Sequence, residues 1–158
     1  MKIGIIFDTH IPVSASALPG KVIEYFSGTD LILHAGDFID LAVLEELKRI
    51  SSVEAVRGNM DPPEVKQILP RKKIIQVGSF KIGLIHGSGS PSGLMERIAK
   101  EFGAERLDAI VFGHSHSPYK QIVDNVLFFN PGSPTDAAVN TFGLIEIADR
   151  ITARIIEL

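Results

Sequence analysis

Histidines and carboxylates stand in this chain in short, regularly spaced groups that suit the binding of divalent metal ions. Asp8 and His10 belong to an Asp-Thr-His triplet, and His114 and His116 belong to a His-Ser-His triplet. In an extended segment, residues two apart point to the same side, so Asp8 and His10 can share one ion. A bend at Gly113 would let the later pair reach two adjacent ions. The chain has no cysteine, so any metal must be held by imidazole, carboxylate or amide groups.

Three further polar residues follow apolar runs elsewhere in the chain: Asp37, Asn59 and His86. With the two triplets they complete a set of donors that suits a hard or borderline divalent cation, not a serine or cysteine nucleophile. Ligands gather at the carboxyl ends of strands in open α/β sheets, so we expect these groups to meet at one edge. Asp37 is the candidate for a ligand shared by two ions, because it closely follows a predicted strand and Gly36 permits close backbone approach.

These donors must be positioned by strands that alternate with helices in the first half of the chain. The segment 40–50 has helical spacing, with Asp40 as its N-terminal cap, and it lies between apolar runs. This alternation predicts parallel β-α-β units. A second helix is predicted over 92–103, where apolar residues recur four apart and Gly103 supplies a left-handed end.

The later part of the chain changes to paired short strands. Residues 76–87 predict two strands around a Gly-Ser turn, and residues 119–130 and 142–158 each predict a hairpin. No repeat, low-complexity segment or composition break marks a linker. We therefore predict an α/β fold in which two mixed β-sheets pack face to face with helices on the outside, in a single domain over residues 1–158.

The composition restricts the partners of the chain. Its formal net charge is -3 and it has no run of like charge, which argues against stable nucleic-acid binding, although a nucleotide-derived substrate stays open. No apolar run approaches the roughly 20 residues of a membrane span, and the N-terminal segment lacks a signal-peptide pattern. We expect a cytoplasmic protein without membrane contact. An exposed hairpin edge near the C-terminus would be free to pair with a second subunit, so a homo-oligomer also stays open.

The polar groups occur in the order Asp-Thr-His, Gly-Asp, Gly-Asn, a lone His before Gly, and Gly-His-Ser-His. This order and spacing resemble the calcineurin-like metallophosphoesterases over nearly the whole chain. The Asn-Pro-Gly-Ser stretch at 130–133 resembles their small single-domain bacterial and archaeal phosphodiesterases. Any one fragment would be weak evidence, but five in order, each after an apolar run, form a specific signal. A eukaryotic retromer subunit that serves as a scaffold shares this compact fold.

The resemblance implies a site for two divalent metal ions. The ligands of one ion would be Asp8, His10, Asp37 and His116, and those of the other would be Asp37, Asn59, His86 and His114. Asp37, Asn59 and His114 would be catalytic, and Asn59 and His114 would also contact the substrate. A hydroxide bridging the two metals would attack phosphorus in line. Manganese is the first expectation, with nickel, cobalt, iron and zinc as alternatives, because this ligand set accepts all of them.

The resemblance therefore implies a metal-dependent phosphodiesterase that acts on a small diester. The alternative is a non-catalytic protein-binding scaffold of the retromer-subunit type, in which the fold persists while the metal site is weak. The complete set of imidazoles favours catalysis, because a scaffold has no need of His10 or His116. A nuclease is disfavoured, because nuclease relatives usually add a nucleic-acid-binding extension and this chain is short and acidic.

Several residues beside the motifs depart from the family pattern or have two interpretations. Met60 stands where larger relatives often carry a proton-donating histidine, so the general acid is unassigned and esters with good leaving groups should react best. Asp61 is either a partner of a ligand histidine or a helix cap ahead of Pro62 and Pro63. Arg57 either contacts substrate phosphate or is an ion-paired or surface residue.

Three further features have mainly structural interpretations. His34 is expected to be a hydrogen-bonded buried residue and not a ligand. The Asn-Pro-Gly-Ser stretch could do no more than form a turn. The glycine-rich segment 86–93 lacks the lysine of a phosphate-binding P-loop, so we expect it to form a rim beside the metals and to cap the following helix.

Overall fold

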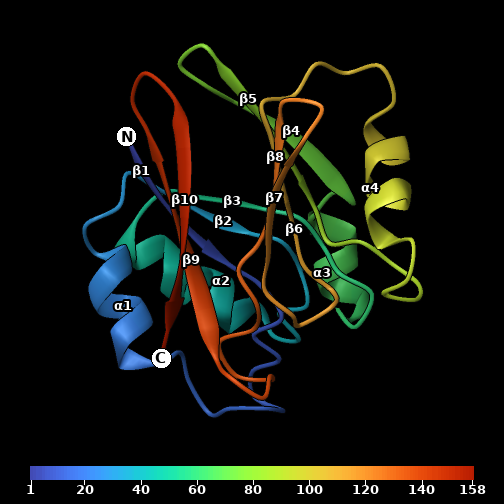
Figure 1. Cartoon of the computed structure of the whole chain (residues 1–158). Coiled ribbons are helices and arrows are strands. Elements are labelled where there is room, and N and C mark those ends of the chain that lie inside the picture. The colour runs from blue at the N-terminus through green and yellow to red at the C-terminus, as the bar shows by residue number, and fades with distance from the viewer.

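Two five-stranded β-sheets form the centre of the protein (Figure 1), in a computed structural model that describes residues 1–158. The strands of the first sheet, in spatial order, are β10 (Ile151–Glu157), β9 (Thr141–Ile147), β1 (Lys2–Ile6), β2 (Leu31–His34) and β3 (Val53–Ala55). Those of the second sheet are β4 (Lys72–Val77), β5 (Phe80–Ile85), β6 (Ala109–Phe112), β8 (Val126–Asn130) and β7 (Tyr119–Val123). The helices are α1 (Gly20–Phe26), α2 (Leu41–Ile50), α3 (Pro63–Ile68) and α4 (Leu94–Phe102).

Both sheets are mixed. Strands β1, β2 and β3 run parallel, so the β-α-β units predicted for the first half of the chain are confirmed. Strand β9 pairs antiparallel with both β1 and β10. In the second sheet β5, β6 and β8 run parallel, and the edge strands β4 and β7 are antiparallel to their neighbours.

The three predicted strand pairs are present as β4–β5, β7–β8 and β9–β10. At the β7–β8 turn, Asp124 and Asn125 have φ angles of 50° and 65°. A type I′ turn needs this left-handed backbone at both central positions, and aspartate and asparagine adopt it at low cost.

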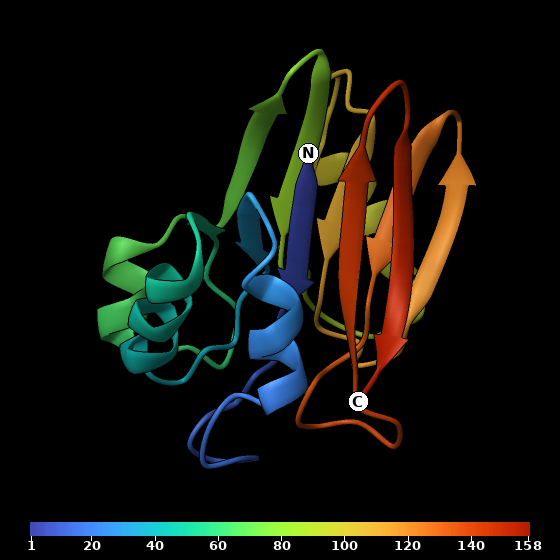
Figure 2. The ribbon, with the colours of Figure 1, turned by 90° about the vertical axis from the view of Figure 1, so that its left-hand side faces the viewer.

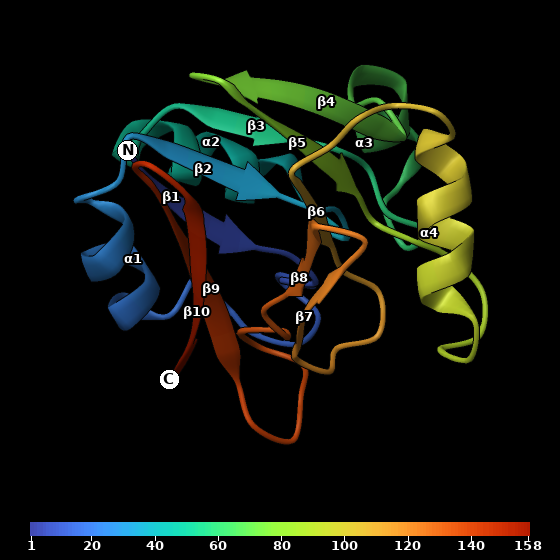
Figure 3. The ribbon, with the colours of Figure 1, turned by 45° about the horizontal axis from the view of Figure 1, so that its top comes forward.

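The two sheets pack face to face with helices on the outer faces, as predicted. Apolar side chains from both sheets, among them Ile5, Leu84, Val111, Phe129 and Ile145, fill the space between them. Helices α1, α2 and α3 pack on the outer face of the first sheet through a separate apolar cluster, and α4 packs on the second. Figure 2 shows the first three helices gathered beside the strands, and Figure 3 shows α1 and α4 on opposite sides of the molecule.

Helices α2 and α4 occupy the segments predicted for them. The Asp40 side chain accepts a hydrogen bond from the backbone N–H of Ala42 at 2.8 Å and caps α2. The glycine-rich segment ends at the N-cap of α4, as expected: the capping residue is Gly93, which has a φ of 69° and makes no side-chain hydrogen bond. None of the four helices has both the length and the apolar composition that a membrane crossing needs.

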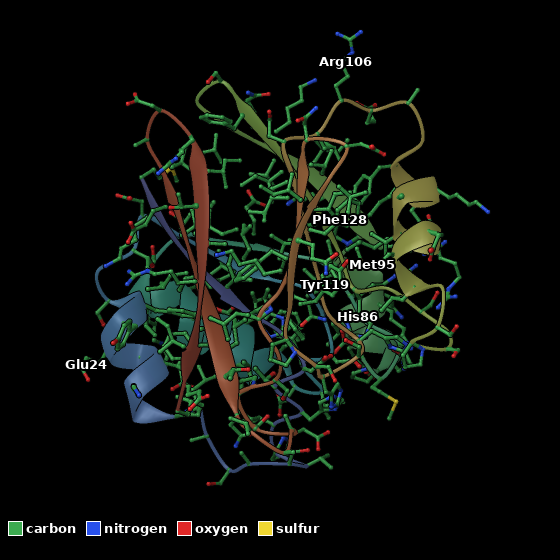
Figure 4. All side chains as sticks on the ribbon, in the orientation of Figure 1. Glu24, His86, Met95, Arg106, Tyr119 and Phe128 are labelled. Carbon is green, nitrogen blue, oxygen red and sulfur yellow. The ribbon has the colours of Figure 1, made fainter.

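The carboxyl ends of the parallel strands of both sheets lie at one end of the sandwich. The loops that follow β1, β2, β3, β5 and β6 there carry all the donors predicted from the sequence. Figure 4 labels His86 in the lower half of the view, whereas Arg106 extends into solvent at the top. The fold therefore brings loops that are distant in sequence to one edge.

Candidate metal centre

The loop after β1 enters the site through a buried and tightly held segment. The backbone N–H of Asp8 donates to the Gly36 carbonyl at 3.0 Å, and that of His10 donates to the Asp37 carbonyl at 3.2 Å. Phe7 is fully buried, as expected for a packing residue, and a Cβ at Gly113 would lie 2.7 Å from its ring. The Asp-Thr-His loop is thus fixed against the loops that follow β2 and β6.

Five of the seven predicted ligands have a left-handed backbone. The φ angles are 46° at Asp8, 44° at His10, 58° at Asp37, 74° at His114 and 53° at His116. A residue with a side chain rarely adopts this region, and the strain persists only where the surrounding structure imposes it. The outer residues of each triplet were expected to point to the same side because the segment is extended. That expectation was wrong, because the backbone bends at Asp8, His10, His114 and His116.

The first group of donors comprises Asp8, His10 and His116, whose donor atoms all lie within 4.8 Å of one another. The Nε2 atom of His116 lies 3.4 Å from Asp8 Oδ2, and the Nε2 atom of His10 lies 4.0 Å from Asp8 Oδ1. This group joins the loops after β1 and β6, and hence both sheets.

The second group comprises Asp37, Asn59, His86 and His114. The Nε2 atom of His86 lies 3.2 Å from Asp37 Oδ2 and 3.0 Å from Asn59 Oδ1. The Nδ1 atom of His114 lies 3.1 Å from the same Asn59 oxygen. Imidazole nitrogens, a carboxylate and an amide oxygen thus converge, which is a donor set for a borderline divalent cation.

Asp37 lies between the two groups. Its Oδ1 atom accepts a hydrogen bond from the backbone N–H of Met60 at 2.8 Å, and its Oδ2 atom faces His86 at 3.2 Å and His10 at 3.9 Å. Gly58 allows this approach, because a Cβ there would lie 2.0 Å from Asp37 Oδ1. The expected close approach at Gly36 is also present, because a Cβ there would lie 2.6 Å from the backbone nitrogen of Gly58. One carboxylate oxygen is held by the backbone, and the other is directed at both groups of imidazoles.

Two buried polar atoms at the centre have no hydrogen-bond partner: Asp8 Oδ1 and His10 Nε2. Leaving a buried polar group unpaired costs about 1–3 kcal/mol. Burial raises the pKa of Asp8 to about 7, despite the opposing effect of His86 and His116. A divalent cation would satisfy both atoms and the Asp8 charge at once, so the residues present fit a metal site.

Hydrogen bonds to backbone carbonyls orient two of the imidazoles. The Nδ1–H of His86 donates to the Ala35 carbonyl at 2.9 Å, and the Nδ1–H of His116 donates to the Asp136 carbonyl at 2.7 Å. In both rings Nε2 is left to face the carboxylates. Orienting a metal-binding histidine through its other nitrogen is a common arrangement. Asp136 was not anticipated, because a carbonyl acceptor can be supplied by any residue type.

The titrating groups of the site influence one another. Burial alone would lower the pKa of His86, but its hydrogen bond to Asp37 and the charge of Asp8 raise it. Burial would raise the pKa of Asp37, but the hydrogen bond and charge of His86 lower it. Burial lowers the pKa of His10. His86 and Asp37 therefore each favour the charged form of the other.

Asp61 has neither of the roles expected for it. Its buried carboxylate accepts hydrogen bonds from the backbone N–H groups of Asp37, Phe38, Ile39 and Gly58, at 2.6–3.1 Å. It contacts no ligand imidazole, and α3 is capped by Pro62 without a side-chain hydrogen bond. The carboxylate instead fixes the loop that carries Asp37 against the loop that carries Asn59.

His34 and the Asn-Pro-Gly-Ser stretch support the same loops. His34 is fully buried and stacks on Phe38, its Nδ1 accepts from the Gly36 N–H at 3.1 Å, and burial holds its pKa well below its usual value. The stretch does more than form a turn. Asn130 Nδ2 donates to the Gly113 carbonyl at 3.2 Å, and Ser133 Oγ donates to the Asp8 carbonyl at 2.8 Å.

Two arginines lie beside the centre. Arg57 forms no ion pair; its Nη1 atom donates to the Lys66 carbonyl at 2.8 Å, and its side chain lines a cleft shared with Asn59 and His86. Arg97 donates to the carbonyls of three serines in the glycine-rich segment, Ser88, Ser90 and Ser92. In the same segment, the Gly89 carbonyl accepts from His114 Nε2 at 2.7 Å. Arg97 therefore supports the rim that orients His114, a role without a local sequence signal.

Comparisons with known proteins agree with this geometry. A family model described as the calcineurin-like phosphoesterase superfamily domain matches residues 1–150. A probable metallophosphoesterase of Methanothermobacter thermautotrophicus is 41% identical over 138 residues, covering 85% of this chain and 78% of that protein. The solved structure of an archaeal phosphodiesterase superposes with a TM-score of 0.79 at 27% identity, covering 100% of both chains. A single mutant of Vps29 from Entamoeba histolytica superposes with a TM-score of 0.81 at 26% identity, covering 100% of this chain and 99% of that chain.

The family match covers most of the chain and includes every loop that carries a predicted ligand. The resemblance inferred from the order of the motifs is therefore confirmed. This chain belongs to the calcineurin-like phosphoesterase superfamily.

Proposed function

We propose that this chain is a metal-dependent phosphodiesterase with two divalent cations, manganese being the first expectation. The ligands of one cation would be Asp8, His10, Asp37 and His116, and those of the other would be Asp37, Asn59, His86 and His114. The observation that carries the proposal is the pair of buried, unpartnered atoms, Asp8 Oδ1 and His10 Nε2, at the centre of these donors. Family membership and the archaeal phosphodiesterase neighbour support the reaction class.

The exposure of the donors indicates how a substrate would approach. Asp8, Asp37 and His86 are at most 2% exposed, whereas Asn59 is exposed and His114 is half-buried. Bound cations would clamp phosphoryl oxygens and lower the pKa of the water that attacks phosphorus. Asn59 and His114 lie at the open side, where their side chains can contact the non-attacking oxygens of the diester.

The leaving group receives no imidazole from the loop after Asn59. Met60 occupies that position, and its side chain is exposed. Because no strong acid is placed there, esters whose leaving groups depart as stable anions should react best. An aryl phosphodiester is therefore the appropriate first substrate.

The test is hydrolysis of bis-p-nitrophenyl phosphate by chelator-stripped protein, with and without added Mn²⁺. We expect turnover only with the cation, and a loss of at least about 100-fold in the Asp37→Asn variant, since a neutral amide replaces the shared carboxylate. Asp149→Asn, at the exposed β9–β10 turn, is the matched control and should retain activity. Folded protein that remains inactive with Mn²⁺, Ni²⁺, Co²⁺, Fe²⁺ and Zn²⁺ would refute the proposal.

A protein-binding scaffold without catalysis is the second candidate, favoured by the likeness to Vps29. A scaffold has no need of the unpartnered Asp8 and His10 atoms, and turnover with a bound cation separates the two candidates. Micromolar or tighter Mn²⁺ binding together with diester hydrolysis supports the enzyme. The scaffold candidate predicts weak cation binding and no turnover in a folded protein.

The proposal also covers the substrate class, the domain that carries the activity and its location in the cell. The substrate is a small phosphodiester, nucleotide-derived esters included, and no stable binding of nucleic acid or membrane is expected from a chain with net charge -3. A single domain over residues 1–158 in the cytoplasm would carry the activity.

A further inference from the structure

A cleft of about 470 Å³ opens directly beside the second group of donors. Asn59 and His86 belong to both the cleft and that group. The cleft extends from them between α3 and α4, which lie on the same side of the molecule in Figure 1. We call it the basic cleft, because its lining includes the cationic side chains of Arg57, Lys66, Arg71, Arg97 and Lys100.

The positive charge of the basic cleft is largely uncompensated. The single acidic residue that lines it, Glu101, pairs with Arg71. The other four cations form no ion pair with a carboxylate of the protein, although the chain as a whole has a net charge of -3. Like charges gathered in one cleft repel one another and raise the local concentration of anions.

The chemistry of the basic cleft favours phosphate. Guanidinium groups present paired N–H donors that match phosphate oxygens, and Arg57 and Arg71 each have N–H groups beyond those used within the protein. Gly87 and Ser88 also line the cleft, and their backbone N–H groups donate no hydrogen bond within the protein. The volume suits a small molecule and not an extended strand of nucleic acid.

We propose that the basic cleft binds a second phosphate group of the substrate, so that preferred substrates are small phosphodiesters that carry a further phosphate. This inference rests on the phosphodiesterase proposal and specifies its substrate class. The scissile phosphate lies at the metal centre, and Asn59 and His86, which line both sites, fix the two as neighbours.

Two esters that differ in a single phosphate test the inference. The p-nitrophenyl ester of thymidine 5′-monophosphate has only the scissile phosphate, and the same ester with a 3′-phosphate adds the second. We expect kcat/KM with Mn²⁺ to be about tenfold higher for the bisphosphate, because one additional charge-assisted hydrogen bond to the substrate changes affinity by about that factor. The preference should shrink to about twofold in Lys100→Gln/Arg71→Gln, and should decline with added salt.

Arg106→Gln is the matched control, because Arg106 is exposed at the opposite end of the molecule (Figure 4). It should keep the full preference. A second measurement needs no catalysis: binding of thymidine 3′,5′-bisphosphate and of thymidine 5′-monophosphate to chelator-stripped protein, by calorimetry. The bisphosphate should bind about tenfold more tightly to the unsubstituted protein and to Arg106→Gln, but not to the double variant.

The possible failures are distinguishable. Equal kcat/KM for the two esters, or a preference that the double variant retains, overturns the second-phosphate inference and leaves the phosphodiesterase proposal intact. Absence of turnover with both esters in Mn²⁺-loaded, folded protein overturns both proposals.

Discussion

The carboxylate of Asp61 accepts a hydrogen bond from the backbone N–H of Asp37, with 3.1 Å between Oδ2 and the nitrogen. The same oxygen accepts from the Gly58 N–H at 2.7 Å, and Oδ1 accepts from Phe38 and Ile39. One buried side chain therefore fixes both the loop that presents Asp37 and the loop that presents Asn59. The precision of the candidate site depends on a residue that itself faces neither group of donors.

Replacing Asp61 by asparagine should damage both stability and cation binding. An amide presents one acceptor and one donor to four N–H groups, so we expect the free energy of unfolding to fall by about 3 kcal/mol. Mn²⁺ affinity should fall about tenfold or more, because the loops carrying the ligands loosen. Urea unfolding and calorimetry check the two effects. Asp40→Asn, which retains a helix cap, is the control, and an Asp61 variant with unchanged Mn²⁺ affinity would contradict this account.

Gly58→Ala should remove activity by displacing Asp37. The new methyl group would lie 2.0 Å from Asp37 Oδ1, so the carboxylate must move away from the Met60 N–H and from its place between the two donor groups. We expect a loss of about 100-fold in kcat/KM for bis-p-nitrophenyl phosphate. Gly20→Ala, at a position with no atom within 4 Å, should be silent. Comparable activity in the two variants would show that Asp37 does not need its observed position.

Arg97→Gln should lower turnover more than cation affinity, because the cation assigned to His114 keeps three other proposed ligands, Asp37, Asn59 and His86. Arg97 holds the glycine-rich segment, and the Gly89 carbonyl of that segment orients His114. Without the arginine, we expect kcat to fall about tenfold, since misplacement of a substrate-contacting group raises the barrier. Steady-state kinetics and Mn²⁺ titration separate the effects, with Arg154→Gln as an exposed control. A loss of cation affinity larger than the loss of kcat would assign Arg97 a different role.

Cation binding should weaken in acid. Burial raises the pKa of Asp8 from 3.8 to about 7, so in the cation-free protein Asp8 holds a proton below that pH, which the cation must displace. Affinity for Mn²⁺ should be full above about pH 7 and fall by up to about tenfold per pH unit below it. Calorimetry in buffers of different ionisation enthalpy measures the released proton. Affinity independent of pH between about 5.5 and 8, without proton release, would count against a buried protonated Asp8.

Local sequence patterns predicted the elements that bury a repeated apolar stripe. In α4, Leu94, Ile98 and Phe102 are all buried, and the segment was recognised. In contrast, α1 buries only Val22 and Phe26, and α3 buries only Val65. These two helices form because the first sheet covers their few apolar residues, and such short segments have no periodic signal.

The donors of the site were recognisable by residue type and by their place after apolar runs, but their geometry was not. The backbone N–H of His114 donates to Asp8 Oδ2 across 106 residues of sequence, a contact that no local pattern specifies. The left-handed backbone at the ligands is imposed by such contacts. Roles that use backbone groups, such as those of Asp61 and the Asp136 carbonyl, also leave no trace in residue spacing.

The donors come from both layers of the sandwich. The first sheet supplies the loops with Asp8, His10, Asp37 and Asn59, and the second supplies those with His86, His114 and His116. In the proposed assignment each cation is bound by both layers, so the separation of the two sheets sets the width of the coordination cage. The apolar residues between the sheets would then take part in choosing the ionic radius that fits, although none of them touches the metal.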